Sequence, residues 1–232
     1  MASSPKLQQP PPHPVVRSAG TTPAPAVPGF ESITYRLLKR SLDLSVAIVG
    51  LVLTLPLFPV IAVLVKLDSK GSVFFAQKRV GRHGCLFTCY KFRSMVADAE
   101  NQKVKLAALN EASGPAFKIR QDPRITAIGS FLRRSSFDEM PQLFNVLLGQ
   151  MSVVGPRPQI PTEVELYEPW HRARLAVKPG ITCLWQISGR SHVGFDEWMR
   201  LDLEYIRRRS LRTDLFILLR TLPAVMARKG AY

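Results

Sequence analysis

A long apolar run without charge dominates the hydropathy pattern of the chain. It extends from Leu44 to Val65. As a helix rising about 1.5 Å per residue, it is long enough to cross a hydrocarbon core of about 30 Å. Pro56 and Pro59 lie in its second half, and each removes a helical hydrogen bond, so the pattern predicts a bend near Pro56. Hydropathy alone favours one spanning helix, whereas the prolines favour a broken one.

Basic residues crowd both ends of this run. Arg36 and Arg40 precede it, and Lys66 and Lys70 follow it. Because positive charge prefers the cytoplasmic side of a membrane, a spanning helix would place one cluster outside. A helix broken at Pro56 that enters one leaflet and returns would keep both clusters in the cytoplasm. We therefore expect a re-entrant anchor, with the N- and C-termini on the cytoplasmic face.

Alternating apolar and polar positions follow the apolar run. They predict two strands, Val73–Gln77 and Leu86–Phe92, joined by a glycine-containing turn. Side chains alternate between the two faces of a strand, so the period of two places Lys91 and Arg93 on one face. The sequence thus predicts a small basic β-hairpin.

Helical patterns account for much of the remaining chain. Residues 96–114 have helical composition, residues 143–148 form an apolar helix, and helical spacing resumes at residue 195. The last segment combines Arg207-Arg208-Arg209 with apolar residues 215–219, which fits helices lying on an anionic membrane surface. The predicted fold class is helix-rich α+β, with a re-entrant membrane helix-break-helix, a small β-hairpin and interfacial amphipathic helices.

Composition divides the chain into three parts. Residues 1–30 are rich in proline and poor in large apolar groups, which predicts a disordered tail. Residues 31–70 form the predicted membrane anchor, and residues 71–232 the predicted cytosolic catalytic domain.

The charge balance narrows the function class. The chain has 32 basic and 17 acidic residues, a net charge of +15, which favours phosphate-bearing partners such as nucleic acids, nucleotides or anionic lipids. The three cysteines, Cys85, Cys89 and Cys183, are an odd number without a Cys-x-x-Cys pair, so reduced thiols are expected. A zinc site at His83, Cys85 and Cys89 would lack a fourth ligand.

Two adjacent carboxylates, Asp138 and Glu139, stand out in this basic chain. Ser136 and Glu139 have the spacing of a capping box, which is one explanation. In the other, Asp138 is the N-cap of a helix, and Pro141 then falls at a tolerated third position. The second explanation is favoured, and it places both acids where the helix dipole attracts anions.

Four basic residues are expected to gather near this pair: Lys91 and Arg93 from the hairpin, with Arg133 and Arg157. Arginine matches phosphate oxygens bidentately, so such a cluster suggests a diphosphate site. Nearby cations should also lower the pKa of Asp138 and keep it ionised. An ionised aspartate there can bind a divalent metal, attack phosphorus or form ion pairs, and the residues alone leave these alternatives open. The sequence has no P-loop, His-Glu-x-x-His or Gly-x-Ser-x-Gly motif.

Several segments together resemble a known family. They are FLRRSSFDEMPQLFNVLLGQMSVVGPRP, KFRSM, KPGITCLWQISGR and LPLFPVIAVLVKLDSKGSVFFAQKRVG. In order and spacing they resemble the monotopic phosphoglycosyl transferases, bacterial sugar transferases that start exopolysaccharide and O-antigen assembly. The similarity runs from about Tyr35 to Tyr232. It implies transfer of a sugar-1-phosphate from a UDP-sugar to undecaprenyl phosphate, with release of UMP.

The resemblance also implies residue roles. Asp138 would be the nucleophile that forms an aspartyl-phosphosugar intermediate, and Glu139, beside it, a Mg²⁺ ligand or orienting acid. The family's phosphate-binding basic residues fall on Lys91, Arg133 and Arg157. Two further acidic positions are matched, without an assigned role, by Asp202 and Asp214. The family's helix-breaking proline falls on Pro56, but Leu55 precedes it where the family commonly has serine, so a hydroxyl–backbone bond shaping the break is expected to be absent.

The implied location is the cytoplasmic face of the bacterial inner membrane, with membrane lipids as partners. The competing interpretation is a membrane-tethered basic module that binds nucleic acid. No nucleic-acid motif is present and the acidic pair would repel phosphate backbones, so we expect no nucleic-acid partner. The ending Gly230-Ala231-Tyr232 resembles family members that use galactose or glucose. Whether the chain forms a homo-oligomer stays open.

Overall fold

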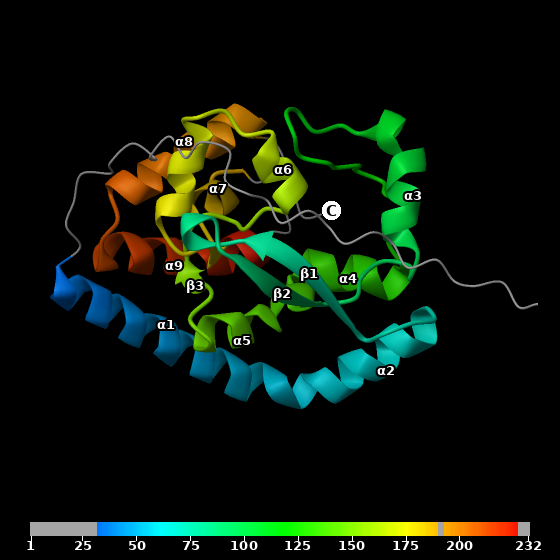
Figure 1. Cartoon of the computed structure of the whole chain (residues 1–232). Coiled ribbons are helices and arrows are strands. Elements are labelled where there is room, and N and C mark those ends of the chain that lie inside the picture. Colours follow the sequence, from blue (N-terminus) through cyan, green and yellow to red (C-terminus); the bar gives the residue numbers. More distant parts are fainter. Residues whose placement is uncertain (1–31, 190–192, 227–232) are drawn as a thin grey trace, which may run out of the picture.

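The computed structural model describes residues 32–189 and 193–226 (Figure 1). The predicted disordered tail and the ending at residues 230–232 lie outside these ranges. Within them the helices are α1 (Ile33–Thr54), α2 (Phe58–Asp68), α3 (Ala99–Lys105), α4 (Ala127–Ser135), α5 (Gln142–Leu147), α6 (Pro161–Glu165), α7 (Leu184–Ile187), α8 (Phe195–Arg207) and α9 (Leu211–Met226). The strands are β1 (Phe74–Val80), β2 (Leu86–Phe92), β3 (Ser152–Val154) and β4 (Gly180–Thr182). The helix-rich α+β class is confirmed.

The apolar run forms a bent helix along one side of the molecule. The helical run from Ile33 to Asp68 is, by length and composition, apolar enough to cross a membrane. It bends where a short 3₁₀ turn, η1 (Leu55–Leu57), holds Pro56 between α1 and α2 (Figure 1). The break predicted at Pro56 is confirmed. Re-entry into one leaflet stays a prediction.

A hydroxyl–backbone bond precedes the bend. The Thr54 Oγ1 donates to the Gly50 carbonyl at 2.7 Å. Such a bond competes with the helical ladder and favours bending. The expectation that Leu55 leaves the break without a hydroxyl contact is therefore wrong, because Thr54, one residue earlier, supplies it.

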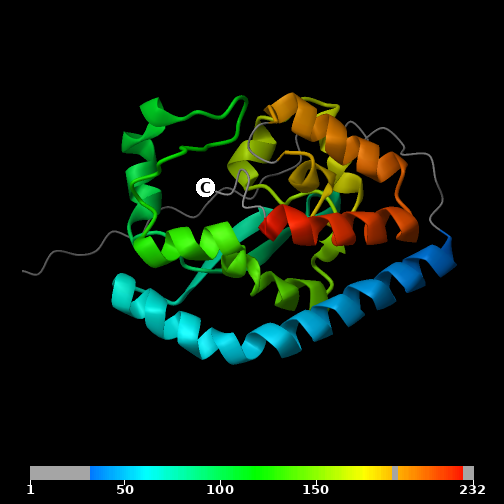
Figure 2. The ribbon, with the colours of Figure 1, turned by 180° about the vertical axis from the view of Figure 1, so that it is seen from behind.

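The bent helix has one buried and one exposed face. Figure 2 shows α4, α5 and α9 along its inner side. Ala47, Phe58 and Val65 are buried there in a core shared with Phe92 and Val146. The opposite face exposes large apolar side chains: Ile48, Val49, Val52, Leu53, Val60, Val63 and Leu67. Exposed contiguous apolar surface of this kind marks a membrane or protein contact.

The hairpin lies close to its predicted place. β1 and β2 pair antiparallel, with Phe74 opposite Phe92 and Val80 opposite Leu86. The second strand has the predicted bounds, and the first extends to Val80 instead of Gln77. Arg93, just beyond β2, turns towards the end of α2 and donates to the Ser69 carbonyl at 2.7 Å. The Arg93 backbone N–H continues the ladder by donating to the Val73 carbonyl at 2.9 Å, and a face shared with Lys91 stays a prediction.

Two other elements differ from the sequence patterns. The helix predicted over 96–114 is limited to α3 and a 3₁₀ turn, Ala107–Leu109. It ends because the Asn110 Oδ1 accepts from the Lys118 backbone N–H at 2.8 Å, which folds the chain into a loop. The helices predicted from residue 195 onward are confirmed as α8 and α9. α9 exposes apolar Leu215, Phe216 and Leu219.

A parallel pair, β3 and β4, was not predicted. The backbones approach so closely beyond β3 that a Cβ at Gly155 would lie 2.5 Å from the Lys178 carbonyl oxygen. A Cβ at Gly180 would lie 2.1 Å from the Gly155 nitrogen. Glycine is thus required at both positions, and the crossing fixes the start of the loop that carries Arg157.

Candidate active site

The acidic pair lies in a 3₁₀ turn between two helices. This turn, η4 (Phe137–Glu139), joins α4 to α5. Ser136 ends α4 in the left-handed conformation at φ 59°, and its side chain makes no cap bond. α5 begins only at Gln142, with Pro141 at the N-cap position. Both the capping box and the Asp138 N-cap are therefore wrong, because one extra turn separates the pair from α5.

Glu139 is buried and clamped by two cations. Its Oε1 accepts from the Lys91 Nζ at 2.6 Å and from the Arg157 Nη2 at 2.7 Å. Burial opposes ionisation, but Arg157 and Lys91 outweigh it and hold the pKa of Glu139 below the usual range of a glutamate. Glu139 is therefore a fixed negative charge between two fixed cations.

Asp138 has a different environment although it is adjacent. It is 6 % exposed and forms no hydrogen bond or ion pair with any residue in the described ranges. Burial raises the pKa of Asp138 to about 6, aided by the charge of Glu139 and opposed by Lys91, Arg133 and Arg157. The expectation that cations lower this pKa is wrong, because desolvation is the larger effect. Asp138 is therefore a carboxylate with a raised pKa and no bond to a described residue, and it is largely ionised at neutral pH.

The predicted cations come from three separate elements. Lys91 lies on β2, Arg133 in the last turn of α4, and Arg157 in the loop after β3. Burial lowers the pKa of Arg133, while the nearby charge of Asp138 opposes this effect. Arg133 makes no hydrogen bond or ion pair within the described part of the chain. The structure thus brings three of the four predicted basic residues to the acidic pair, and the Arg133 guanidinium is available to a ligand. The expectation for Arg93 is wrong, because its guanidinium bonds the Ser69 carbonyl at the end of α2 instead.

Two further cations belong to the same cluster. Burial, together with Arg157 and Arg133, lowers the pKa of Lys118 to about 8. Burial and Arg157 also lower the pKa of Arg79, whose Nη1 donates to the Pro158 carbonyl at 3.0 Å. Both residues lie in short basic stretches, KRVGR and FKIR. The sequence did not indicate that they belong to the site, because they are far from Asp138 along the chain. We call Asp138, Glu139, Lys91, Arg133, Arg157, Lys118 and Arg79 the catalytic cluster.

The backbone carbonyl of Arg157 accepts a hydrogen bond from Arg174, which forms a buried ion pair with Asp202. The Arg174 Nη2 donates to the Arg157 carbonyl at 2.8 Å and to the Asp202 Oδ2 at 2.6 Å. Asp202 is completely buried. It therefore supports the catalytic cluster through Arg174, a residue that sequence reasoning missed.

Asn145 fixes the hairpin against the acidic turn. This fully buried residue of α5 donates to the Thr88 carbonyl at 2.7 Å and accepts from the Tyr90 N–H at 3.2 Å. β2 carries Lys91 directly after Tyr90. Asn145, also missed from the sequence, thus sets the position of Lys91 relative to Glu139.

Comparison with known proteins shows the family of the chain. The model of the bacterial sugar transferase family matches residues 34–228. The chain belongs to the bacterial sugar transferase family. It is 45 % identical over 203 residues to galactosyl transferase CpsE of Streptococcus agalactiae, covering 87 % of this chain and 45 % of CpsE. It is 44 % identical over 202 residues to the undecaprenyl-phosphate galactose phosphotransferase of Salmonella typhimurium, covering 85 % and 42 %.

A shorter relative matches along most of its length. The exopolysaccharide production protein ExoY of Sinorhizobium fredii is 40 % identical over 198 residues, covering 84 % of this chain and 88 % of ExoY. The chain therefore spans less than half of CpsE and of the Salmonella protein but most of ExoY. The matched region contains every residue of the catalytic cluster.

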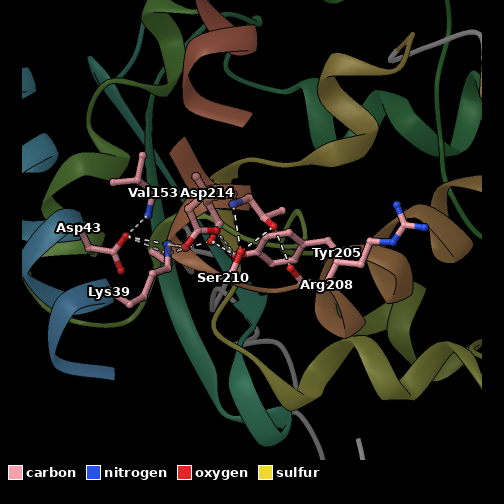
Figure 3. A network of polar contacts seen from close by, with 10 residues as sticks. Lys39, Asp43, Val153, Tyr205, Arg208, Ser210 and Asp214 are labelled. Atoms are coloured by element: carbon pink, nitrogen blue, oxygen red, sulfur yellow. Dashed lines mark hydrogen bonds and ion pairs between the residues drawn. The ribbon is translucent and has the colours of Figure 1, made fainter. Parts of the chain in front are cut away.

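Asp214, the second of the two further acidic positions in the family pattern, lies outside the catalytic cluster. Its Oδ1 accepts from the Tyr205 hydroxyl at 2.8 Å, and its Oδ2 lies 3.2 Å from the Lys39 Nζ. Lys39 also reaches Asp43, so the network joins α1 to α9 (Figure 3). Asp214 is thus a buried residue that holds the fold.

The acidic pair offers only part of a metal site. In the described ranges, no three His, Cys, Asp or Glu side chains gather around a common metal position. Mg²⁺, however, is commonly held by one or two carboxylates together with substrate phosphates and water. In the part of the chain that the structure describes, Asp138 forms no bond, and the Oε2 of Glu139 lies outside its two ion pairs. The residues present therefore fit a magnesium ion shared with a diphosphate substrate.

Proposed function

We propose that this sugar transferase moves a sugar-1-phosphate from a UDP-sugar, UDP-galactose or UDP-glucose, to undecaprenyl phosphate, which starts exopolysaccharide or O-antigen synthesis. The observation that carries the proposal is Asp138, a buried carboxylate that bonds no described residue and is influenced by the charges of Lys91, Arg133 and Arg157. The substrate class is supported by the Salmonella relative, named an undecaprenyl-phosphate galactose phosphotransferase. Membership in a sugar transferase family favours this activity over nucleic-acid binding.

The first step forms a covalent bond to the enzyme. A carboxylate oxygen of Asp138 attacks the phosphorus that carries the sugar, and the bond from this phosphorus to the UMP oxygen breaks. The electron pair leaves with UMP, and an aspartyl-phosphosugar ester remains. Phosphoryl transfer depends mainly on position and charge neutralisation, which Lys91, Arg133 and Arg157 supply.

The second step regenerates the enzyme. A phosphate oxygen of undecaprenyl phosphate attacks the same phosphorus, and the ester bond to Asp138 breaks with its electron pair returning to the carboxylate. The product is the undecaprenyl diphosphate sugar. Because the nucleotide leaves first, one basic site serves a soluble donor and a lipid acceptor in turn.

A magnesium ion is part of the proposal. Asp138 and Glu139 would hold it together with the donor diphosphate, and it would neutralise charge on the phosphates. Chelation should abolish turnover, and added Mg²⁺ should restore it. Full turnover after exhaustive chelation would contradict this part of the proposal.

The bent helix is proposed to enter one leaflet of the cytoplasmic membrane and return. Three features support this arrangement: the bend at Pro56, the exposed apolar face, and basic residues at both ends. Both ends of the bent helix also lie towards the catalytic part of the chain (Figure 1). In sealed vesicles, tags at the two termini should then show equal protease access. One cleaved and one protected tag would show that the helix spans.

The activity is tested with labelled donors. Membranes containing the chain are incubated with undecaprenyl phosphate and a panel of radiolabelled nucleotide sugars, and lipid-extractable label is counted. We expect label from UDP-galactose or UDP-glucose, with UMP as co-product. Absence of label from every donor, in membranes that contain the folded protein, would contradict the proposed function.

A further inference from the structure

A second charged cavity lies away from the catalytic cluster. It has a volume of about 150 Å³ and lies between the N-terminal half of α1, β3 and the segment before β4. Its lining includes six basic residues: Arg36, Lys39, Arg40, Arg82, Lys178 and Arg209. Asp43 is the acidic residue in the lining, and no member of the catalytic cluster takes part. We call this space the α1 cavity.

Some of these cations already have partners in the fold. Lys39 lies 3.1 Å from Asp43 and 3.2 Å from Asp214. Figure 3 draws these contacts. Arg40 donates to the Val146 and Leu147 carbonyls at 2.7 and 2.8 Å. These bonds fix the walls of the α1 cavity and leave its excess of positive charge in place.

Lys178 brings an additional charge into this crowded region. Its Nζ makes no hydrogen bond or ion pair with the described residues. A Cβ placed at Gly149 would lie 3.6 Å from the Lys178 Nζ and 3.8 Å from the Arg40 Nη2, so the two cations converge. Burial, Arg40 and Arg82 lower the pKa of Lys178. An anion bound between these groups would relieve their repulsion.

The α1 cavity also lies near the apolar surface of the bent helix. Leu37 and Leu38, between its cationic residues, are 64 % and 49 % exposed. The continuous exposed apolar face begins at Ile48, about 12 Å beyond Arg40 along the helix axis. When that face contacts lipid, the α1 cavity lies at the depth of the headgroups, where anionic lipids attract Lys and Arg.

We propose that the α1 cavity binds the phosphate of an anionic phospholipid headgroup. A free phosphate offers the same chemistry, but it would gain nothing from the exposed leucines beside the cavity. The site is separate from the catalytic cluster and would fix the N-terminal end of α1 at the membrane surface. The proposal does not depend on the identity of the sugar or of the acceptor.

The test measures binding without turnover. The full chain in detergent is unfolded thermally with dihexanoyl phosphatidylglycerol, dihexanoyl phosphatidylcholine or inorganic phosphate. Phosphatidylglycerol at ten times its Kd should raise the unfolding midpoint by about 3 °C, and the other two should have smaller effects. Equal shifts with phosphatidylcholine, or no shift with either lipid, would overturn the proposal. An equal shift with inorganic phosphate would assign the site to a soluble anion and overturn the lipid assignment.

Two matched double variants distinguish phosphatidylglycerol binding in the α1 cavity from general electrostatic attraction to the basic protein. Arg36→Gln/Lys178→Gln removes two charges from the α1 cavity and should abolish the phosphatidylglycerol shift. Lys66→Gln/Lys70→Gln removes the same charge from exposed positions at the other end of the bent helix and should retain it. Equal loss in both double variants would show diffuse electrostatic binding and contradict the proposal.

Discussion

Two buried acidic networks in this molecule have opposite characters. In the network of Figure 3, Asp43 Oδ1 accepts from Lys39, from the Ser152 hydroxyl and from the Val153 N–H, while Asp214 accepts from Tyr205. In the catalytic cluster Glu139 accepts two bonds from cations, but its neighbour Asp138 has no partner among the described residues.

The difference separates acids that hold the fold from an acid that is available for chemistry. A buried charge with several partners stabilises one conformation, whereas a buried charge without a partner costs free energy. Such a cost is tolerated where the group reacts. Substituting the two kinds of acid should therefore change stability in opposite directions.

The largest expected change in stability follows loss of Asp202. Burial raises the pKa of Asp202 to about 6 although Arg174 opposes this effect, so ionised Asp202 also carries a desolvation cost. Unlike Asp138, however, Asp202 neutralises the buried Arg174, which stays charged. Asp202→Asn leaves that guanidinium without its counter-charge, and we expect the free energy of unfolding to fall by about 3 kcal/mol. Denaturant titration measures this value. On the same helix, Glu204→Gln breaks an exposed ion pair with Arg208 and should cost less than about 1 kcal/mol. Equal losses in the two variants would show that Asp202 is not a structural acid.

Loss of Asp138 should stabilise the protein. Its pKa is raised to about 6, so ionisation in the folded state costs stability that grows as pH rises from about 4 to 6. Asp138→Asn removes this cost, and we expect it to raise the free energy of unfolding by up to about 3 kcal/mol at pH 8. The gain should vanish below pH 4. A variant that is less stable than the wild type at pH 8 would contradict the proposed state of Asp138.

The same titration should appear in catalysis. Only ionised Asp138 can attack, so kcat/KM for the nucleotide sugar should fall about tenfold between pH 7 and pH 5. Glu139 should not contribute, because its pKa is lowered below this interval. A flat profile over this range, with the protein folded, would argue against Asp138 as the titrating nucleophile.

A smaller effect is expected at Lys118. Lys118→Met removes one charge from the catalytic cluster and should raise KM for the donor about three- to tenfold, with a smaller change in kcat. It should also remove an alkaline decline in activity near pH 8, where Lys118 loses its proton. Lys105→Met, at an exposed position on α3, provides the control. Identical kinetics for both variants would place Lys118 outside the donor site.

Local patterns predicted much of the fold. The strand Leu86–Phe92 and the bend at Pro56 depend on side-chain alternation and on a missing backbone donor, both of which are encoded by neighbouring residues. The convergence of Lys91, Arg133 and Arg157 was also expected, although from the resemblance of motifs and charge rather than from geometry.

Longer-range contacts could not be predicted in the same way. Arg174 binds Asp202, 28 residues away, and Asn145 binds Thr88, 57 residues away. The left-handed conformation of Ser136 depends on the packing of α4 against η4. Because of it, neither Ser136 nor Asp138 forms the predicted helix cap. The raised pKa of Asp138 depends on burial, which composition does not reveal. The sequence thus indicated which charged residues are present, whereas the three-dimensional structure determines which of them form ion pairs and which do not.

The most direct measurement is the intact mass of the enzyme after incubation with donor in the absence of acceptor. The account predicts an added hexose phosphate on the wild type, located by peptide mapping on Asp138 and lost on addition of undecaprenyl phosphate. Asp138→Asn should carry no adduct and should lose at least about a thousandfold in turnover. An adduct of the same amount on Asp138→Asn, or full turnover by that variant, would contradict the central claim.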